Sequence, residues 1–216
     1  MTYSQEIFIL PSVNSGKIKD EFKLDSNTRV MLFVGRMNRE MGLDVILDII
    51  PKVLSQRNDA VFFIVGARGE LIGKTEQLQL RFKNSVYIIT DVPFDKLPYY
   101  YAACDILLAP TRGRHASMGM SIKEAMATGK PVITVDSPGI REAVINGETG
   151  LLVQTDENLN IQKDLFCDAI FRMLDSQQMR NSMGLSARKR AQDLFNKNTT
   201  SRKMISIFES LSEKQT

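Results

Sequence analysis

Residues 110–129 read Pro-Thr-Arg-Gly-Arg-His-Ala-Ser-Met-Gly-Met-Ser-Ile-Lys-Glu-Ala-Met-Ala-Thr-Gly and follow the apolar run Ile106–Ala109. This order predicts the end of a buried strand, a polar loop that contains glycine, and a short helix of small residues. Ser117 is the predicted N-cap of that helix, and Gly129 followed by Pro131 is expected to end it. The start of such a helix presents free backbone N–H groups and the positive end of the dipole, which suits a phosphate.

Glu124 is the charged residue of this stretch that asks for an explanation. It lies six residues past Met118, or about 9 Å along a helix axis at ~1.5 Å per residue. At that distance the carboxylate does not repel a phosphate at the helix start, and it can reach a ribose attached to that phosphate. The residues three and four positions away offer no ion-pair partner: Met120, Ser121, Ala127 and Thr128.

The composition indicates one sizeable globular domain. The chain has 216 residues, of which 43% are hydrophobic and 25% are charged. No apolar run approaches the ~18 residues that span a bilayer, and no signal-peptide pattern is present. Cys104 and Cys167 lie among apolar residues, so a disulfide framework is not expected and a cytoplasmic location is the default. His115 is the single histidine, which disfavours a metal site.

Positive charge gathers toward the C-terminal end of the chain. The net charge of +3 is too small to indicate nucleic-acid binding. Between Gln177 and Lys203, however, many basic residues face one acid, Asp193; they are Arg180, Arg188, Lys189, Arg190, Lys197, Arg202 and Lys203. Two interpretations stay open. The run is either a solvated helical face, or a surface for an acidic partner or for anionic lipid at the inner face of a membrane.

Short apolar runs alternate with helical patterns along the chain. After a polar connection that ends near Asn27, the predicted strands are 30–34, 61–65, 86–89, 106–109, 132–135 and 150–153. The predicted helices are 42–55, 70–82, 94–103 and 139–144, and the chain is expected to be helical from 161 to its end. The predicted fold class is therefore α/β: a doubly wound, parallel, six-stranded Rossmann-like sheet with helices on both faces and a helical C-terminal extension.

Glycines and an arginine follow several of these strands. Gly35-Arg36, Gly66, Pro110-Thr111 and 137–139 all come at carboxyl ends, which share one edge of a parallel sheet, where ligands bind. Arg36 supplies a permanent forked cation suited to phosphate, and Gly35 permits close backbone approach. For Gly66, a tight turn and a ligand contact are equally good interpretations. No G-x-G-x-x-G follows the first strand, so an NAD site is disfavoured.

Taken together, these segments resemble the C-terminal, donor-binding domain of the GT-B, group 1 (family 4-type) retaining glycosyltransferases. The resemblance covers roughly residues 7–210 in consistent order. Its segments are Phe-Val-Gly-Arg-Met at 33–37, Gly-Leu-Asp at 42–44, Ile-Val-Gly at 64–66, and longer matches at 101–111, 124–133 and 139–153. It implies half of a GT-B fold, with 1–28 as a crossing segment, 29–160 as the nucleotide-sugar-binding domain, and 161–216 as a helical extension packed on that domain.

The resemblance also implies a function in glycan or lipid-linked glycan biosynthesis. Such enzymes transfer a sugar from a nucleotide diphosphate donor, here a UDP- or GDP-sugar, to an acceptor held mainly by an N-terminal half that this chain lacks and needs in cis or trans. Arg36 would contact the diphosphate and Glu124 the ribose, and these two are the best catalytic candidates. The full implied donor set is Gly35, Arg36, Gly66, Thr90, Asp91, Val92, Thr111, Ser117, Met118, Gly119, Met120 and Glu124. Residues 90–92 would lie near the base and 117–120 near the sugar and distal phosphate, with no metal or other cofactor.

Two substitutions depart from the family pattern. The family's common lysine five residues after the arginine is Met41 here, and the first glutamate of its paired-glutamate pattern is Ala116. Losing one such charge or hydrogen bond typically costs about 2.7–4 kcal/mol of transition-state stabilisation. Arg112 or Arg114 either replaces the missing lysine or is simply solvated, and we expect His115 to be an exposed loop residue rather than a base. A non-catalytic nucleotide-sugar-binding subunit or regulatory module is therefore the alternative to an enzyme half.

Overall fold

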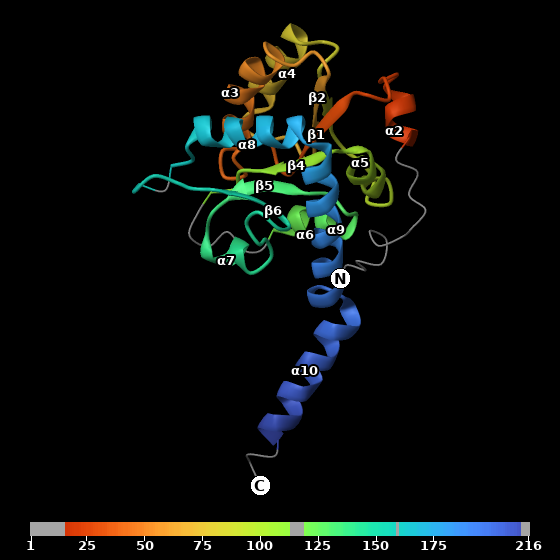
Figure 1. The fold of residues 1–216 in the computed structure, drawn as a ribbon, viewed down its shortest axis with the longest axis vertical. Helices are drawn as coiled ribbons and strands as arrows, with labels where there is room; N and C mark the ends of the chain where they lie inside the picture. Colours follow the sequence, from red (N-terminus) through yellow and green to blue (C-terminus); the bar gives the residue numbers. More distant parts are fainter. Residues whose placement is uncertain (1–15, 113–118, 159, 213–216) are drawn as a thin grey trace.

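The computed structural model describes residues 16–112, 119–158 and 160–212 (Figure 1). The strands are β1 (Arg29–Val34), β2 (Ala60–Val65), β3 (Val86–Ile89), β4 (Ile106–Ala109), β5 (Val132–Val135) and β6 (Gly150–Val153). The helices are α2 (Gly16–Glu21), α3 (Leu43–Leu54), α4 (Ile72–Arg81), α5 (Leu97–Ala103), α6 (Met120–Ala127), α7 (Pro138–Arg141), α8 (Lys163–Asp175), α9 (Gln177–Leu194) and α10 (Lys197–Ser212).

The six strands form one parallel sheet in the order β3-β2-β1-β4-β5-β6. All six predicted strands are confirmed, and so is the α/β fold class. The strands could be recognised in the sequence because a strand covered on both faces is apolar throughout rather than at alternate positions. In β2, for example, every residue is buried.

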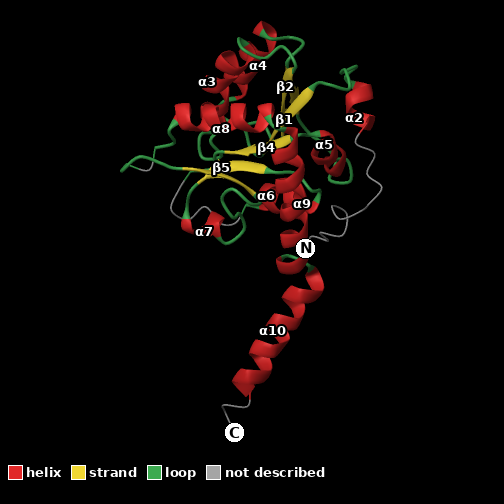
Figure 2. Cartoon of the chain, viewed as in Figure 1, coloured by secondary structure: helices red, strands yellow, loops and turns green. Residues whose placement is uncertain are grey.

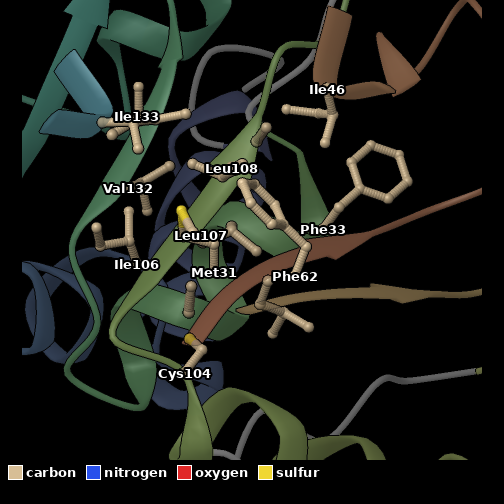
Figure 3. Close-up of a cluster of buried hydrophobic side chains, with 14 of the residues drawn as sticks. Met31, Phe33, Ile46, Phe62, Cys104, Ile106, Leu107, Leu108, Val132 and Ile133 are labelled. Atoms are coloured by element: carbon tan, nitrogen blue, oxygen red, sulfur yellow. The ribbon is translucent and has the colours of Figure 1, made fainter. Parts of the chain in front are cut away.

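Helices cover both faces of the sheet (Figure 2). Helix α3 packs against β2, α4 and α8, and α8 extends this layer over β5 and β6. On the other face, α6 packs against β4, β5, α5 and α9, while α2 packs against α5. Figure 3 shows the core between these layers, where buried side chains from β1, β2, β4, β5 and α3 meet; those labelled are Met31, Phe33, Ile46, Phe62, Cys104, Ile106, Leu107, Leu108, Val132 and Ile133.

Two of three predictions about local structure need correction. The polar connection before Asn27 contains a helix, α2, which buries Ile18. The helix after β4 begins at Met120, and its N-cap is Gly119 rather than Ser117, which lies outside the described residues. The end predicted at Gly129 is confirmed: its N–H donates to the Met126 carbonyl at 2.9 Å in a left-handed turn (φ +74°).

The C-terminal region is helical, as predicted, but its last helix leaves the domain. Helices α8 and α9 pack against the sheet and its helices, whereas α10 projects away from them (Figure 1). Large apolar side chains of α10 are accordingly exposed: Met204, Ile205, Ile207 and Phe208. Across the described ranges, no helix combines the length and apolar character that a bilayer-spanning segment needs.

Candidate functional site

The strand order places a topological switch point between β1 and β4. The chain moves outward from β1 to β3 on one side and from β4 to β6 on the other, so the connections diverge at the carboxyl ends of β1 and β4. In open α/β sheets ligands bind at such a switch point. The loop after β1 carries Gly35 and Arg36, and the loop after β4 carries Pro110 and Thr111, so these predicted residues share one edge, here called the carboxyl edge.

The loops at this edge touch one another through backbone. A Cβ atom on Gly42, whose φ is +76°, would lie 1.8 Å from the Pro110 carbonyl oxygen. A Cβ atom on Gly66, whose φ is +142°, would lie 2.1 Å from the Gly35 carbonyl oxygen. Neither position has room for a side chain. This contact explains Gly66 as a tight turn that packs on Gly35.

Arg36 is an exposed cation at the carboxyl edge, in the loop after β1. Within residues 16–112, 119–158 and 160–212, no acidic side chain lies within ion-pair distance of its guanidinium. The aliphatic part of the Arg36 side chain lies beside the loop that follows β2, since a Cβ atom on Gly69 of that loop would lie 3.3 Å from Arg36 Cγ. The guanidinium therefore offers its forked donors to a ligand.

Arg112 has a different role from either of the two predicted ones. Its Nη1 and Nη2 donate to the Asp44 carboxylate at 2.5 and 2.9 Å, and Nη1 also donates to the Arg39 carbonyl at 2.6 Å. Burial alone would raise the pKa of Asp44, but the hydrogen bond and charge of Arg112 hold that pKa below its ordinary value. Arg112 thus ties the β4 loop to the start of α3, so it is more than a solvated loop arginine, and both of its Nη groups are engaged within the fold. Arg114, His115 and Ala116 lie outside the described residues.

Glu124 lies on α6 with 6% of its surface exposed, so the carboxyl group is buried. The Tyr101 hydroxyl on α5 donates to Glu124 Oε2 at 2.7 Å. Burial raises the pKa of Glu124, and the hydrogen bond from Tyr101 partly offsets this. The tyrosine was missed because it lies 23 residues away in the sequence.

The start of α6 opens at the same edge as Gly35 and Thr111, because α6 follows β4. Gly119 is the N-cap with φ +48°, and within the part of the chain that the structure describes no side chain caps the first turn. The first backbone N–H groups of a helix have no partner within it. Met120 is 43% exposed at this position, and Ser117 and Met118 lie outside the described residues.

Residues 90–92 line a separate cavity at the end of β3. It has a volume of about 320 Å³, and its other walls come from α2 and α5, including Lys17, Tyr99 and Tyr100. Asp91 adopts a left-handed conformation (φ 58°), which turns the chain out of the strand. Two strand spacings, about 10 Å, separate β3 from β1. The structure therefore brings Gly35, Arg36, Gly66 and Thr111 together and places 90–92 farther along the same edge.

Comparison with known proteins decides the family. The sequence profile described as "Glycosyl transferases group 1" matches residues 28–176, more than half of the chain. The chain belongs to the group 1 glycosyltransferases. A D-inositol 3-phosphate glycosyltransferase of Corynebacterium aurimucosum is 30% identical over 173 residues, which cover 77% of this chain and 39% of the relative. The chain spans less than half the length of such glycosyltransferase relatives.

Solved glycosyltransferase structures share the fold. Anabaena Alr3699/HepE, crystallised with UDP, superposes with a TM-score of 0.82 at 19% identity, covering 96% of this chain and 56% of its own. The C-terminal domain of the group 1 glycosyltransferase LpcC from Francisella tularensis gives a TM-score of 0.73 at 16% identity; the match covers 91% of this chain and all of that domain. The fold is therefore that of one half of a GT-B enzyme.

Proposed function

We propose that this group 1 glycosyltransferase chain is the donor-binding half of a retaining enzyme that uses a nucleotide diphosphate sugar. The observation that carries the proposal is the carboxyl edge at the β1–β4 switch point. At this edge the exposed guanidinium of Arg36 follows β1. The start of α6, which no described side chain caps, follows the neighbouring strand β4. Both features favour anionic phosphate groups.

A nucleotide diphosphate sugar would lie along this edge. Arg36 would bind the diphosphate, and the backbone of 117–120 the distal phosphate and sugar. The base would enter the cavity lined by Thr90, Asp91 and Val92, since a bound nucleotide has to extend from β1 toward β3. Structural relatives support this choice of ligand, because Alr3699/HepE has been crystallised with UDP and with UDP-glucose.

Glu124 would accept hydrogen bonds from the ribose hydroxyls. Tyr101 already donates to Oε2 at 2.7 Å, which fixes the carboxyl group on α6 before any ligand arrives. A preorganised acceptor loses little rotamer entropy on binding. In this arrangement the diphosphate charge falls on Arg36 and the α6 N-terminus, and donor binding needs no divalent cation.

Calorimetry with a panel of UDP- and GDP-sugars, with and without EDTA, tests the proposal. One charge-assisted hydrogen bond contributes about 1.5–3 kcal/mol, so Arg36→Ala should weaken binding roughly 10- to 150-fold. Arg81→Ala is the matched control, because Arg81 is an exposed arginine at the end of α4, next to the opposite edge. The proposal fails if no donor binds below millimolar concentration, or if both Arg36→Ala and Glu124→Ala bind as tightly as the wild type.

The second function is a non-catalytic nucleotide-sugar-binding subunit, and Met41 favours it. A Cβ atom placed on Gly35 would lie 3.5 Å from Met41 Cγ, so an apolar side chain borders the diphosphate position. Combining this chain with an acceptor-binding half and following sugar transfer separates the two functions. Transfer with retention of the anomeric configuration supports the enzyme, and Met41→Lys should then accelerate it. Donor binding without transfer, even in Met41→Lys, supports the subunit.

A further inference from the structure

A second cavity lies at the opposite edge of the sheet, here called the amino edge. Its volume is about 390 Å³, within the range of small-molecule sites. Arg29 of β1, Asp105 before β4 and Pro131 before β5 contribute to its wall, so it opens at the strand starts. The rest of the wall comes from the C-terminal turn of α6 and from α9. The donor-site residues discussed above are absent from its lining.

Four cations and one carboxylate line this amino-edge cavity. The cations are Arg29, Lys130, Arg180 and Arg188, and the acid is Asp105. The lining thus carries more positive than negative side chains. The net charge of the whole chain is +3 over 216 residues, so its overall composition does not account for this concentration of positive side chains around one cavity.

Packing fixes the α9 cations in place. Arg180, Gly184 and Arg188 are spaced by four residues, which puts them on one face of the helix. That face meets the turn after α6, because a Cβ atom on Gly184 would lie 2.2 Å from the Gly129 carbonyl oxygen. This close packing seats the helix face that carries Arg180 and Arg188 beside the cavity.

Arg180 is the buried member of the group. Its side chain is 5% exposed, and its Nη1 donates to the Met173 and Leu174 carbonyls at 2.5 and 2.8 Å. Its Nε lies 3.9 Å from Asp105 Oδ1. Burial, reinforced by the charge of Arg29, lowers the pKa of Arg180. The basic run at 177–203 is therefore not simply a solvated face.

Asp105 does not neutralise the cavity. Its Oδ2 accepts the Val30 N–H at 2.9 Å, and its Oδ1 lies 3.5 Å from Arg29 Nη1. One carboxylate thus faces both Arg29 and Arg180, while Lys130 is left without an acidic partner among the described residues. Uncompensated charge near a low-dielectric interior is costly, and an incoming anion would relieve the cost.

We infer that the amino-edge cavity binds a phosphate group, carried either by a small phosphorylated molecule or by a lipid headgroup. Several convergent cations suit a dianion better than a carboxylate, and guanidinium forks match phosphate oxygens. The cavity is larger than a bare phosphate needs, so it has room for part of the molecule that carries it. This site is independent of the proposed donor site, which lies at the other end of the strands.

Calorimetric titration of the chain with inorganic phosphate, at constant ionic strength, tests the inference. Lys130→Ala and Arg188→Ala should each weaken binding about tenfold, the equivalent of 1.4 kcal/mol. Lys189→Ala is the matched control, since it removes the same charge from an exposed position of α9 outside the cavity lining and should leave binding unchanged. Arg36→Ala should leave unchanged the component of phosphate binding that Lys130→Ala weakens, which separates this site from the donor site. Arg180 is left intact because it joins α8 to α9.

Sedimentation with phosphatidic acid vesicles, compared with phosphatidylcholine vesicles, separates the two phosphate sources. Binding of soluble phosphate that Lys130→Ala weakens supports a small phosphorylated ligand. Vesicle binding that Lys130→Ala weakens, without binding of soluble phosphate, supports a lipid headgroup. The inference is overturned if neither probe binds, or if both bind Lys130→Ala, Arg188→Ala and Lys189→Ala equally well.

Discussion

Replacing Tyr101 by phenylalanine isolates the hydrogen bond that holds Glu124. The substitution removes one oxygen atom and leaves the ring, which is fully buried, in place. It deprives Glu124 Oε2 of a donor at 2.7 Å while the carboxyl group stays buried at 6% exposure. A hydrogen bond to a charged acceptor contributes about 1.5–3 kcal/mol, so we expect Tyr101→Phe to lower the free energy of unfolding by about 2 kcal/mol near neutral pH.

The penalty should depend on pH because Glu124 titrates. Burial raises the pKa of Glu124 above its ordinary 4.5, so the folded state binds this proton more tightly than the unfolded state. Between the unfolded and folded pKa values, Glu124 therefore makes the protein less stable as pH rises. Tyr101 opposes this effect by stabilising the carboxylate. Tyr101→Phe should raise the pKa of Glu124 further, and its penalty should be larger at pH 8 than at pH 4.

Thermal and urea unfolding at both pH values measure the effect. For a chain of this size, about 2 kcal/mol corresponds to a fall in Tm of about 4–8 °C at pH 8. Glu124→Gln keeps an acceptor for the hydroxyl and removes the charge, so it should be at least as stable as the wild type at pH 8. Tyr99→Phe is the control, because it removes the same atom from a half-buried tyrosine of α5.

A double-mutant cycle completes the test. Tyr101→Phe and Glu124→Gln should couple by about 0.5–3 kcal/mol at pH 8. Equal penalties at both pH values together with zero coupling would refute the reasoning. If Glu124→Gln is also more stable but binds nucleotide sugars less tightly, the buried carboxylate is present for binding rather than for folding.

Other changes give further expectations. Gly42→Ala should destabilise the fold by about 2–4 kcal/mol in urea unfolding, because its Cβ atom would meet the Pro110 carbonyl oxygen at 1.8 Å. Arg112→Ala should cost about 1–3 kcal/mol at pH 7 by unpairing Asp44. Since the pKa of Asp44 is lowered in the folded state, that difference should shrink as pH falls below about 4, as acid titration followed by circular dichroism would show. Burial raises the pKa of Cys104 to about 12, so a thiol reagent at pH 8 should label it only after unfolding.

The sheet could be predicted from the sequence because its signal is local. The run Val61–Val65, for instance, is apolar at every position, as a strand with covered faces must be, and β2 spans Ala60–Val65. Helix α2 was missed because its six residues contain only one buried side chain, Ile18, and its packing against α5 depends on residues far along the chain. A short helix with one core contact has no measurable period.

The residues at the carboxyl edge could also be predicted from local sequence. The side-chain pairs between the loops of that edge could not. Gly35 and Arg36 follow a recognisable strand, and the parallel topology alone brings them to the edge. Arg112 and Asp44 lie 68 residues apart, and no spacing rule connects them. The sequence suggested two roles for Arg112, exposure to solvent or ligand binding. Neither is the role that the structure shows, which is an ion pair with Asp44 within the fold.

Arg36 and Arg112 have different roles at the carboxyl edge, and this difference explains why an exposed cation is tolerated there. Arg112 is neutralised by Asp44 and locks the two loops of the switch point together. With the loops already fixed, Arg36 is not needed for stability, and an exposed cation costs little in water. With Met41 in place of the family's lysine, the proposed donor site has one cation fewer beside Arg36. Donor binding by this chain should therefore depend more steeply on Arg36, and less steeply on ionic strength, than in relatives that retain the lysine.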